Sequence, residues 1–252
     1  MKVGFIITAR LKSTRLPKKL LKEIDGMTMI SLMIKRLKLA QELENIVIAT
    51  STNPEDDPLE EIAINEGIEC FRGSEEDVIS RLYEASKKYE FDYVINMTAD
   101  CPMVPFDFIG DVIDTYLKTD ADLVSCYDLP AGLFLSGLKV DGMKKLLELK
   151  ASDNTEYWLY YYLKTDIFKV VPLSIDQSLK RDNYRVVLDY PEDFEMLEKL
   201  YQGLGKDAYS KSTRVLISYL DEHPELAKIN IHCMEKGQER TDNDPHSKVK
   251  LK

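Results

Sequence analysis

The feature that most constrains this chain is its start, where an apolar run over residues 3–9 breaks abruptly into a loop rich in cations. Apolar side chains occupy both faces of the run, which is typical of a strand buried inside a parallel sheet. The segment from Arg10 to Lys22 holds six cations and no carboxylate. Open α/β sheets bind ligands just outside the carboxyl ends of their strands. Position and charge therefore predict a site for a small polyanion, with a solvated basic loop as the alternative.

Composition limits the class of protein to which this loop can belong. The chain has 252 residues, 44% of them hydrophobic, which is enough for the core of one large α/β domain. The four cysteines show no C-x-x-C spacing, and no apolar stretch approaches the roughly 20 residues of a membrane span, so we expect a reduced, soluble, cytoplasmic protein. Met1 and Lys2 lead directly into the first strand, so no signal sequence is expected. The net charge of -10 argues against nucleic acid, whose phosphate backbone requires a wide basic face.

Strand-like and helix-like segments alternate along the chain. This pattern predicts an α/β fold, a Rossmann-like three-layer sandwich with a mostly parallel sheet. Residues 1–234 form one predicted domain, and the polar residues 235–252 are expected to be a disordered tail. Strands are expected at 3–9, 46–50, 68–71, 93–97, 123–126 and 185–188, and helices are expected to begin near residues 28, 57, 74, 108 and 191.

Two carboxylates follow predicted strands at the sheet edge that carries the basic loop. Asp100 comes after the fourth strand and Asp189 after the last. Asp100 is a candidate metal ligand, although an Asp placed before Pro102 also suits a turn cap. Glu192 and Asp193 occupy the first turn of the next helix, where the helix dipole favours acids, so they need no catalytic explanation.

Aromatic and histidine residues do not add to this predicted site. The aromatic cluster between Tyr157 and Tyr162 is typical of a core or a subunit interface rather than of a ligand site. All three histidines lie in or near the C-terminal tail, so catalysis by a histidine-activated nucleophile is not expected.

Several short blocks of the chain carry a resemblance to a known family. The N-terminal block resembles the signature of the sugar-acid cytidylyltransferases, which include the CMP-Kdo synthetases and the acylneuraminate cytidylyltransferases. Further blocks at 49–51, 56–57, 71–78, 100–102 and 189–193 resemble the branch of spore coat polysaccharide biosynthesis. The residues of the N-terminal block are Ala9, Arg10, Ser13, Thr14, Arg15, Leu16, Pro17 and Lys19.

The resemblance implies Mg²⁺-dependent transfer of CMP from CTP to a sugar acid or related polar acceptor, with release of pyrophosphate. It implies a catalytic role for Arg10, Arg15 and Lys19, because phosphoryl transfer depends on positioning and charge stabilisation. Asp100 and Asp189 are implied to hold the Mg²⁺, which would place their carboxylates about 4 to 6 Å apart. The family's pairing habit and the aromatic cluster also imply a homodimer. The implied nucleotide-binding residues are Ala9, Arg10, Ser13, Arg15 and Lys19 around the phosphates, and Ala49, Thr50, Ser51, Arg72, Gly73, Ser74 and Asp77 around the cytosine.

The chain departs from the family pattern at three places. The residue before the last lysine of the signature is usually Gly, but here it is Lys18, which either contacts phosphate or points to water. At residues 130–134 and 154–157, the acidic and basic groups expected to grip a hydroxylated acceptor in the spore coat branch are partly replaced by apolar and aromatic ones. An unusual acceptor and an altered or lost activity are both open.

Two other functions remain open as well. Metal-dependent glycosyltransferases of similar architecture carry an Asp-x-Asp element at the end of a strand, and Asp120-Ala121-Asp122 has that spelling. This element precedes a predicted strand rather than following one, so it is expected to start a loop. A nucleotide-binding homologue without catalysis is the remaining alternative.

Overall fold

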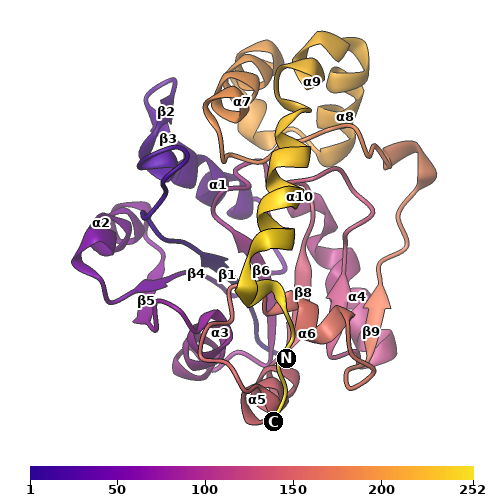
Figure 1. The fold of residues 1–252 in the computed structure, drawn as a ribbon. Helices are drawn as coiled ribbons and strands as arrows, with labels where there is room; N and C mark the ends of the chain where they lie inside the picture. Colours follow the sequence, from indigo (N-terminus) through magenta and orange to yellow (C-terminus); the bar gives the residue numbers. More distant parts are fainter.

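The computed structural model describes residues 1–252, and a seven-stranded sheet runs through its centre (Figure 1). The strand order is β5-β4-β1-β6-β8-β7-β9. The first four strands in this order are parallel, β8 is antiparallel to both of its neighbours, and β9 is parallel to β7. The strands are β1 (Val3–Thr8), β4 (Asn45–Ser51), β5 (Glu69–Gly73), β6 (Tyr93–Thr98), β7 (Leu123–Ser125), β8 (Ser136–Lys139) and β9 (Val170–Pro172), and β2 (Glu23–Ile24) pairs with β3 (Met27–Thr28) in a separate hairpin.

Helices cover both faces of the sheet, and a separate apolar core lies on each face. Side chains of β1 alternate between these cores, with Phe5 and Ile7 in the larger one and Ile6 in the smaller. The predicted α/β fold with a mostly parallel sheet is therefore confirmed. The larger core includes side chains of α1 (Met29–Leu37), α2 (Asp57–Glu66), α4 (Ile109–Thr119), α7 (Pro191–Leu204), α8 (Thr213–Glu222) and α9 (Pro224–Asn230), and the smaller one side chains of α3 (Val78–Lys88), α5 (Val140–Leu149) and α6 (Leu159–Leu163).

Local capping chemistry sets the helix ends, with one shift from the sequence-based expectation. The Thr28 side chain accepts a hydrogen bond from the Ser31 amide at the start of α1, as its position predicts. Helix α3 begins at Val78 rather than at Ser74, because Asp77 caps it through the Ser80 amide. Ser74 instead caps the preceding turn, where its hydroxyl accepts a hydrogen bond from the Asp77 amide.

The segment 185–188 is extended but is not a strand of the sheet, so this prediction is wrong. It forms a single bridge, Ala131 to Arg185, because the sheet positions beyond β6 are filled by β8, β7 and β9. Gly132 permits this close approach: its φ is +91°, and a Cβ there would lie 2.3 Å from the Val186 carbonyl oxygen. The Leu188 amide then donates to the Asp100 carbonyl at 2.7 Å, which sets Asp189 beside Asp100.

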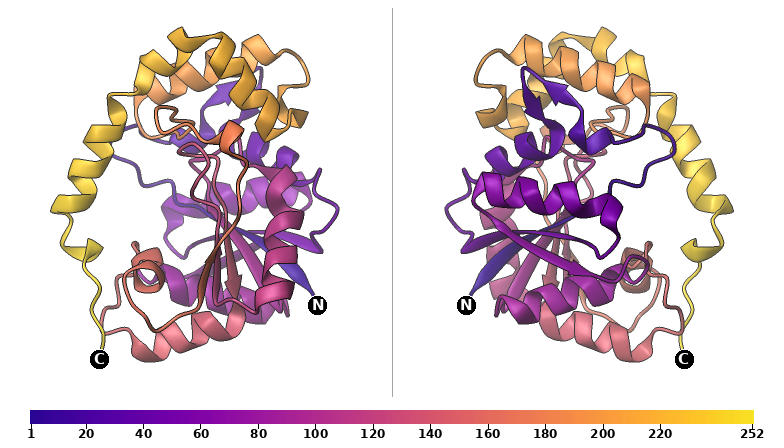
Figure 2. Two further views of the ribbon diagram at one scale, coloured as in Figure 1. Left: turned by 90° about the vertical axis from the view of Figure 1, so that its right-hand side faces the viewer. Right: turned by 90° about the vertical axis from the view of Figure 1, so that its left-hand side faces the viewer.

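The C-terminal residues also differ from the disordered tail that their polarity predicts. Residues 233–243 form helix α10 (Cys233–Asn243), and Leu251 bridges to Lys150. Figure 2 shows α10, in yellow, running along one side of the molecule and leaving most of its surface exposed. Its polar composition therefore reflects exposure, while contacts at its two ends hold it in place.

Most of the aromatic cluster packs inside the molecule. Trp158, Tyr161 and Tyr162 belong to the smaller core, where the Tyr162 ring lies 4.4 Å from that of Phe168. Tyr157 and Tyr160, the other two aromatic residues of the cluster, are partly exposed. The cluster therefore contributes mainly to the core of a single chain. The homodimer stays a prediction. No helix combines the length and the apolar character needed to cross a bilayer.

Candidate active site

A cavity of about 420 Å³ opens at the carboxyl ends of β1 and β6. Its volume is typical of a small-molecule site. Six cations and four carboxylates line it, an excess of positive charge in a chain of net charge -10. The cations are Arg10, Lys12, Arg15, Lys19, Arg81 and Arg240, and the carboxylates are Glu76, Asp100, Glu156 and Asp189.

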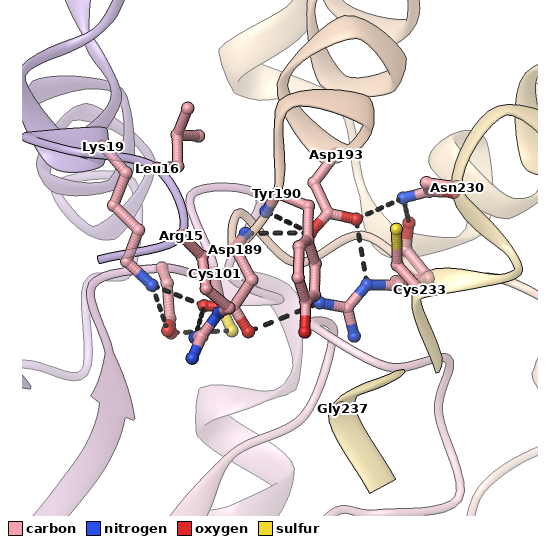
Figure 3. A network of polar contacts seen from close by, with 12 residues as sticks. Arg15, Leu16, Lys19, Cys101, Asp189, Tyr190, Asp193, Asn230, Cys233 and Gly237 are labelled. Carbon is pink, nitrogen blue, oxygen red and sulfur yellow. Dashed lines mark hydrogen bonds and ion pairs between the residues drawn. The ribbon is translucent and has the colours of Figure 1, made fainter. Parts of the chain in front are cut away.

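The structure brings together the basic loop and the two predicted metal ligands. The Lys19 ammonium donates to Asp100 Oδ2 at 2.8 Å and to Asp189 Oδ1 at 2.7 Å, so the two carboxylates lie no more than two hydrogen-bond lengths apart. Arg15 Nη2 donates to the same Asp189 oxygen at 2.5 Å. Figure 3 shows Lys19, Arg15 and Asp189 pointing toward one another. These groups form a network of charges at one end of the cavity.

Charge balance keeps this network ionised. Burial alone would raise the pKa of the Asp189 carboxyl, but the charges and hydrogen bonds of Lys19 and Arg15 hold that pKa well below its usual range. Burial opposes the charge on Lys19 as well, yet the two carboxylates raise its pKa above 10.5. Lys19 is only 8% exposed, so it depends on these partners.

Asp193 organises the turn that carries Asp189. Its buried carboxylate accepts hydrogen bonds from the amides of Asp189 and Tyr190, at 2.8 and 3.0 Å, and from Arg185 Nε at 2.9 Å. The Asn230 amide donates to it at 2.9 Å from α9, and Figure 3 shows this contact. The helix-dipole explanation of Asp193 was therefore incomplete, because the residue positions the loop of the site.

A second buried carboxylate fixes the start of the basic loop. Asp56 Oδ1 accepts a hydrogen bond from the Leu11 amide at 2.7 Å, and the Ser51 hydroxyl donates to its other oxygen at 2.5 Å. Farther along the loop, Lys18 is exposed and has a φ of 51° in the left-handed region. That backbone conformation explains why glycine suits this position. The exposed Lys18 side chain is outside the cavity lining.

All the residues predicted around the phosphates line the cavity, whereas those predicted around the cytosine do not. The β4 residues among them are buried in the sheet, and Arg72 bonds to Asp57 at 2.7 Å and to the Ser51 carbonyl at 3.0 Å. Asp77 caps α3 and pairs with Lys150 at 2.7 Å. These residues therefore contact other protein groups behind the cavity lining and do not form part of the lining. The predicted phosphate-binding residues that line the cavity are Ala9, Arg10, Ser13, Arg15 and Lys19. The predicted cytosine-binding residues that do not line it are Ala49, Thr50, Ser51, Arg72, Gly73, Ser74 and Asp77.

Arg81 is a site residue that the sequence reasoning missed. It is fully buried, and its Nη1 donates to the Glu75 carbonyl at 3.2 Å, but its Nε and Nη2 have no hydrogen-bond partner. Burial, and then the charge of Arg10, lowers its pKa to about 10. A buried cation with unused donors on a cavity wall favours an anionic ligand. The sequence signal was an arginine three residues after Val78 on the apolar face of α3.

The cavity lining also contains Glu156, Trp158 and Arg240, none of which was predicted as a site residue. Glu156 belongs to the segment 154–157 that departs from the family pattern. Its carboxylate lies 3.5 Å from Arg10 Nη2 and 3.6 Å from Arg240 Nη2. The altered segment therefore contributes directly to the cavity.

The remaining acidic motif and a further cluster of ligand atoms lie outside the cavity lining. Asp120 pairs with Lys139 at 2.7 Å, and Asp122 accepts a hydrogen bond from the Lys169 amide at the amino end of β7. Asp120 and Asp122 therefore belong to the loop that precedes β7, as the sequence predicts. Separately, potential ligand atoms of Glu192, His232 and Cys233 lie within 4.8 Å of one another at the start of α10.

Comparison with known proteins decides the family. Residues 4–217 match the family model described as cytidylyltransferase. The chain belongs to the cytidylyltransferase family. This confirms the resemblance drawn from the signature blocks and makes the protein a member of a nucleotidyltransferase family that uses CTP.

Three known proteins are similar to this cytidylyltransferase in sequence or in structure. It is 28% identical to the spore coat polysaccharide biosynthesis protein SpsF of Bacillus subtilis, over 88% of this chain and 95% of that protein. The structure of a cytidylyltransferase from Leptospira borgpetersenii serovar Hardjo-bovis has a TM-score of 0.83 at 27% identity, covering 90% of this chain and 97% of that one. CMP:2-keto-3-deoxy-manno-octonic acid synthetase in complex with CTP shares the fold, with a TM-score of 0.62 at 17% identity and coverage of 81% and 99%.

Proposed function

We propose that this cytidylyltransferase moves CMP from CTP to a sugar acid or related polar acceptor and releases pyrophosphate. The observation that carries the proposal is the meeting of the basic loop with Asp100 and Asp189 in one cavity. The name of the relative SpsF supports a role in the synthesis of surface polysaccharide or glycoconjugate. We place this reaction in the cytoplasm, with CTP and a small acceptor as partners.

The chemistry of the reaction matches the charges of the site. An acceptor oxygen attacks the α-phosphorus of CTP, the bond to the β-phosphate bridging oxygen breaks, and pyrophosphate leaves. Negative charge develops on the phosphate oxygens, so preorganised cations lower the barrier. Arg15 and Lys19 would bind the triphosphate, and Arg81 offers two further donors from the cavity wall. The guanidinium groups suit bidentate contacts to phosphate, while Lys19 supplies a point charge.

The residues at the Asp100 end also fit a divalent cation. Mg²⁺ binds oxygen ligands, commonly one or two carboxylates together with substrate phosphates. Asp100 and Asp189 line the cavity, and both contact the same Lys19 ammonium, so their charges converge on one point. These two residues would hold the ion, and bound Mg²⁺ would neutralise charge on the phosphates.

The test is direct. Thermal-shift titration with the four nucleoside triphosphates and Mg²⁺ should show the largest stabilisation by CTP, and pyrophosphate should appear when pools of sugar acids or sugar phosphates are added. Arg15→Ala should remove turnover, whereas Arg214→Ala should not, because Arg214 is exposed and pairs with Asp176 outside the cavity. Equal stabilisation by GTP or UTP would contradict the proposed nucleotide. Consumption of a CMP-sugar without pyrophosphate release would favour a glycosyltransferase.

A further inference from the structure

Helix α10 contributes to the cavity lining although it lies outside the residues that match the family model. It begins sixteen residues after the matched region 4–217 ends, and it crosses in front of the sheet in Figure 1. Among its residues, Arg240 lines the cavity. The cavity wall therefore includes a cation from a helix outside the family match.

Both ends of α10 are fixed to the body of the protein. At its start, Cys233 is buried and the His232 ring lies 3.3 Å from Glu192 at the head of α7. At its end, the Tyr157 hydroxyl donates to Asp244 at 3.1 Å, and the Ala151 amide donates to the carbonyl of residue 250 at 2.9 Å. None of these contacts involves Arg240, so the guanidinium is not needed at either end of the helix and is available for a ligand.

The contacts of Arg240 support a ligand-binding role. Its guanidinium lies 3.6 Å from Glu156, and Arg10 lies 3.5 Å from the other oxygen of the same carboxylate. Both distances exceed the 2.7 to 2.9 Å that is typical of strong charge-assisted hydrogen bonds. The Arg240 side chain is 46% exposed and the Glu156 side chain 41%, so this contact contributes little to stability. Two arginines thus share one weakly held carboxylate at the cavity wall.

We propose that Arg240 binds the phosphates of CTP together with Arg10, and that Glu156 competes with these phosphates for the two guanidinium groups. A triphosphate presents more charge and more oxygens than one carboxylate, so it displaces Glu156 from both arginines. The proposal rests on CTP being the substrate. It makes a C-terminal residue part of the nucleotide site and gives Glu156 an opposing effect on binding.

Isothermal titration of the full-length protein with CTP and Mg²⁺ tests this assignment. Arg240→Ala should weaken CTP binding about tenfold, the loss expected for one partly exposed charge-assisted contact, and should leave cytidine binding unchanged. Glu156→Gln should tighten CTP binding, because it removes the competing charge. Lys236→Ala is the matched control: Lys236 also lies on α10 but pairs with Glu192 outside the cavity, so CTP affinity should not change.

Other outcomes overturn the assignment in distinguishable ways. If the Arg240–Glu156 pair only fastens α10, both substitutions weaken CTP binding to the same extent, and the phosphate role is excluded. If the parent protein binds CTP and Arg240→Ala binds it equally well, Arg240 has no nucleotide role while the proposed function stands. A parent protein that fails to bind CTP would remove both proposals together.

Discussion

Replacing Lys19 with Met should destabilise the fold as well as remove a phosphate ligand. Lys19 is the shared partner of Asp100 and Asp189, and its side chain is only 10% exposed. Without it, Asp189 keeps Arg15 at 2.5 Å and Arg185 at 3.4 Å. Asp100 keeps no cation, and its remaining side-chain donors are the Thr98 hydroxyl and the Cys101 thiol. Two partly buried carboxylates would then share a reduced positive charge.

The magnitude follows from the burial of these groups. Removing one partner of a fully buried ion pair costs about 3 to 5 kcal/mol. The carboxylate side chains are 24% and 18% exposed here, so water screens part of the effect and we expect a loss of about 2 to 3 kcal/mol. Combining Lys19→Met with Asp100→Asn should cost less than the sum of the two changes, by about 1 to 2 kcal/mol, since the residues are in contact.

The effect should also depend on pH. The pKa of Asp189 is lowered in the folded protein, so its contribution is fully present above the ordinary value of 3.8 and is lost as the pH falls through the folded value. The pKa of Lys19 is raised, so its contribution is fully present below 10.5 and is lost as the pH rises through the folded value. The stability difference between parent and Lys19→Met should therefore be greatest at neutral pH and shrink in acid.

Urea unfolding followed by circular dichroism, without nucleotide, measures these differences apart from catalysis. Lys22→Met provides the control, because Lys22 belongs to the same loop but lies outside the cavity, and its ammonium lies over the Phe194 ring rather than beside a carboxylate. Equal stability of parent and Lys19→Met at pH 7, or full additivity with Asp100→Asn, would refute the reasoning.

Three further changes test the fold and the assembly. Lys18→Gly should raise the free energy of unfolding by about 1 kcal/mol, because glycine tolerates the φ of 51° at this position; unchanged or lower stability in urea would contradict this. Gly132→Ala should cost about 3 kcal/mol or more, since its Cβ would collide with the Val186 carbonyl, and a parent-like melting temperature would show that the loop can move. Light scattering at micromolar concentration should report a homodimer, and a monomer would count against the pairing inferred from the family.

The first strand and its basic loop were predictable because their signals are local. Apolar side chains on both faces of residues 3–8 specify a buried strand, and the cations that follow it specify an anion site at its end. Asp100 was found in the same way, from its place after a strand. In each of these cases, the information lies within a few residues of the chain.

Residues that act through distant partners were missed. The role of Asp193 depends on Asn230, 37 residues away, and sequence spacing gives no sign of that contact. Periodicity also misplaced the strand at 185–188, because an extended apolar segment does not reveal whether a neighbouring strand is free to pair with it. Arg81 stood on an apolar helix face, a local anomaly whose meaning depends on the cavity beside it.

The most informative departure joins two regions that sequence alone treats as unrelated. The segment 154–157 departs from the family pattern, and α10 lies beyond the family match, yet they meet twice in the structure. Glu156 contacts Arg240, and Tyr157 contacts Asp244. A change in either region therefore alters the surroundings of the other. The altered segment and the C-terminal helix both contribute to the cavity lining, through Glu156 and Arg240, so the effect of a substitution at Glu156 should depend on whether Arg240 is present.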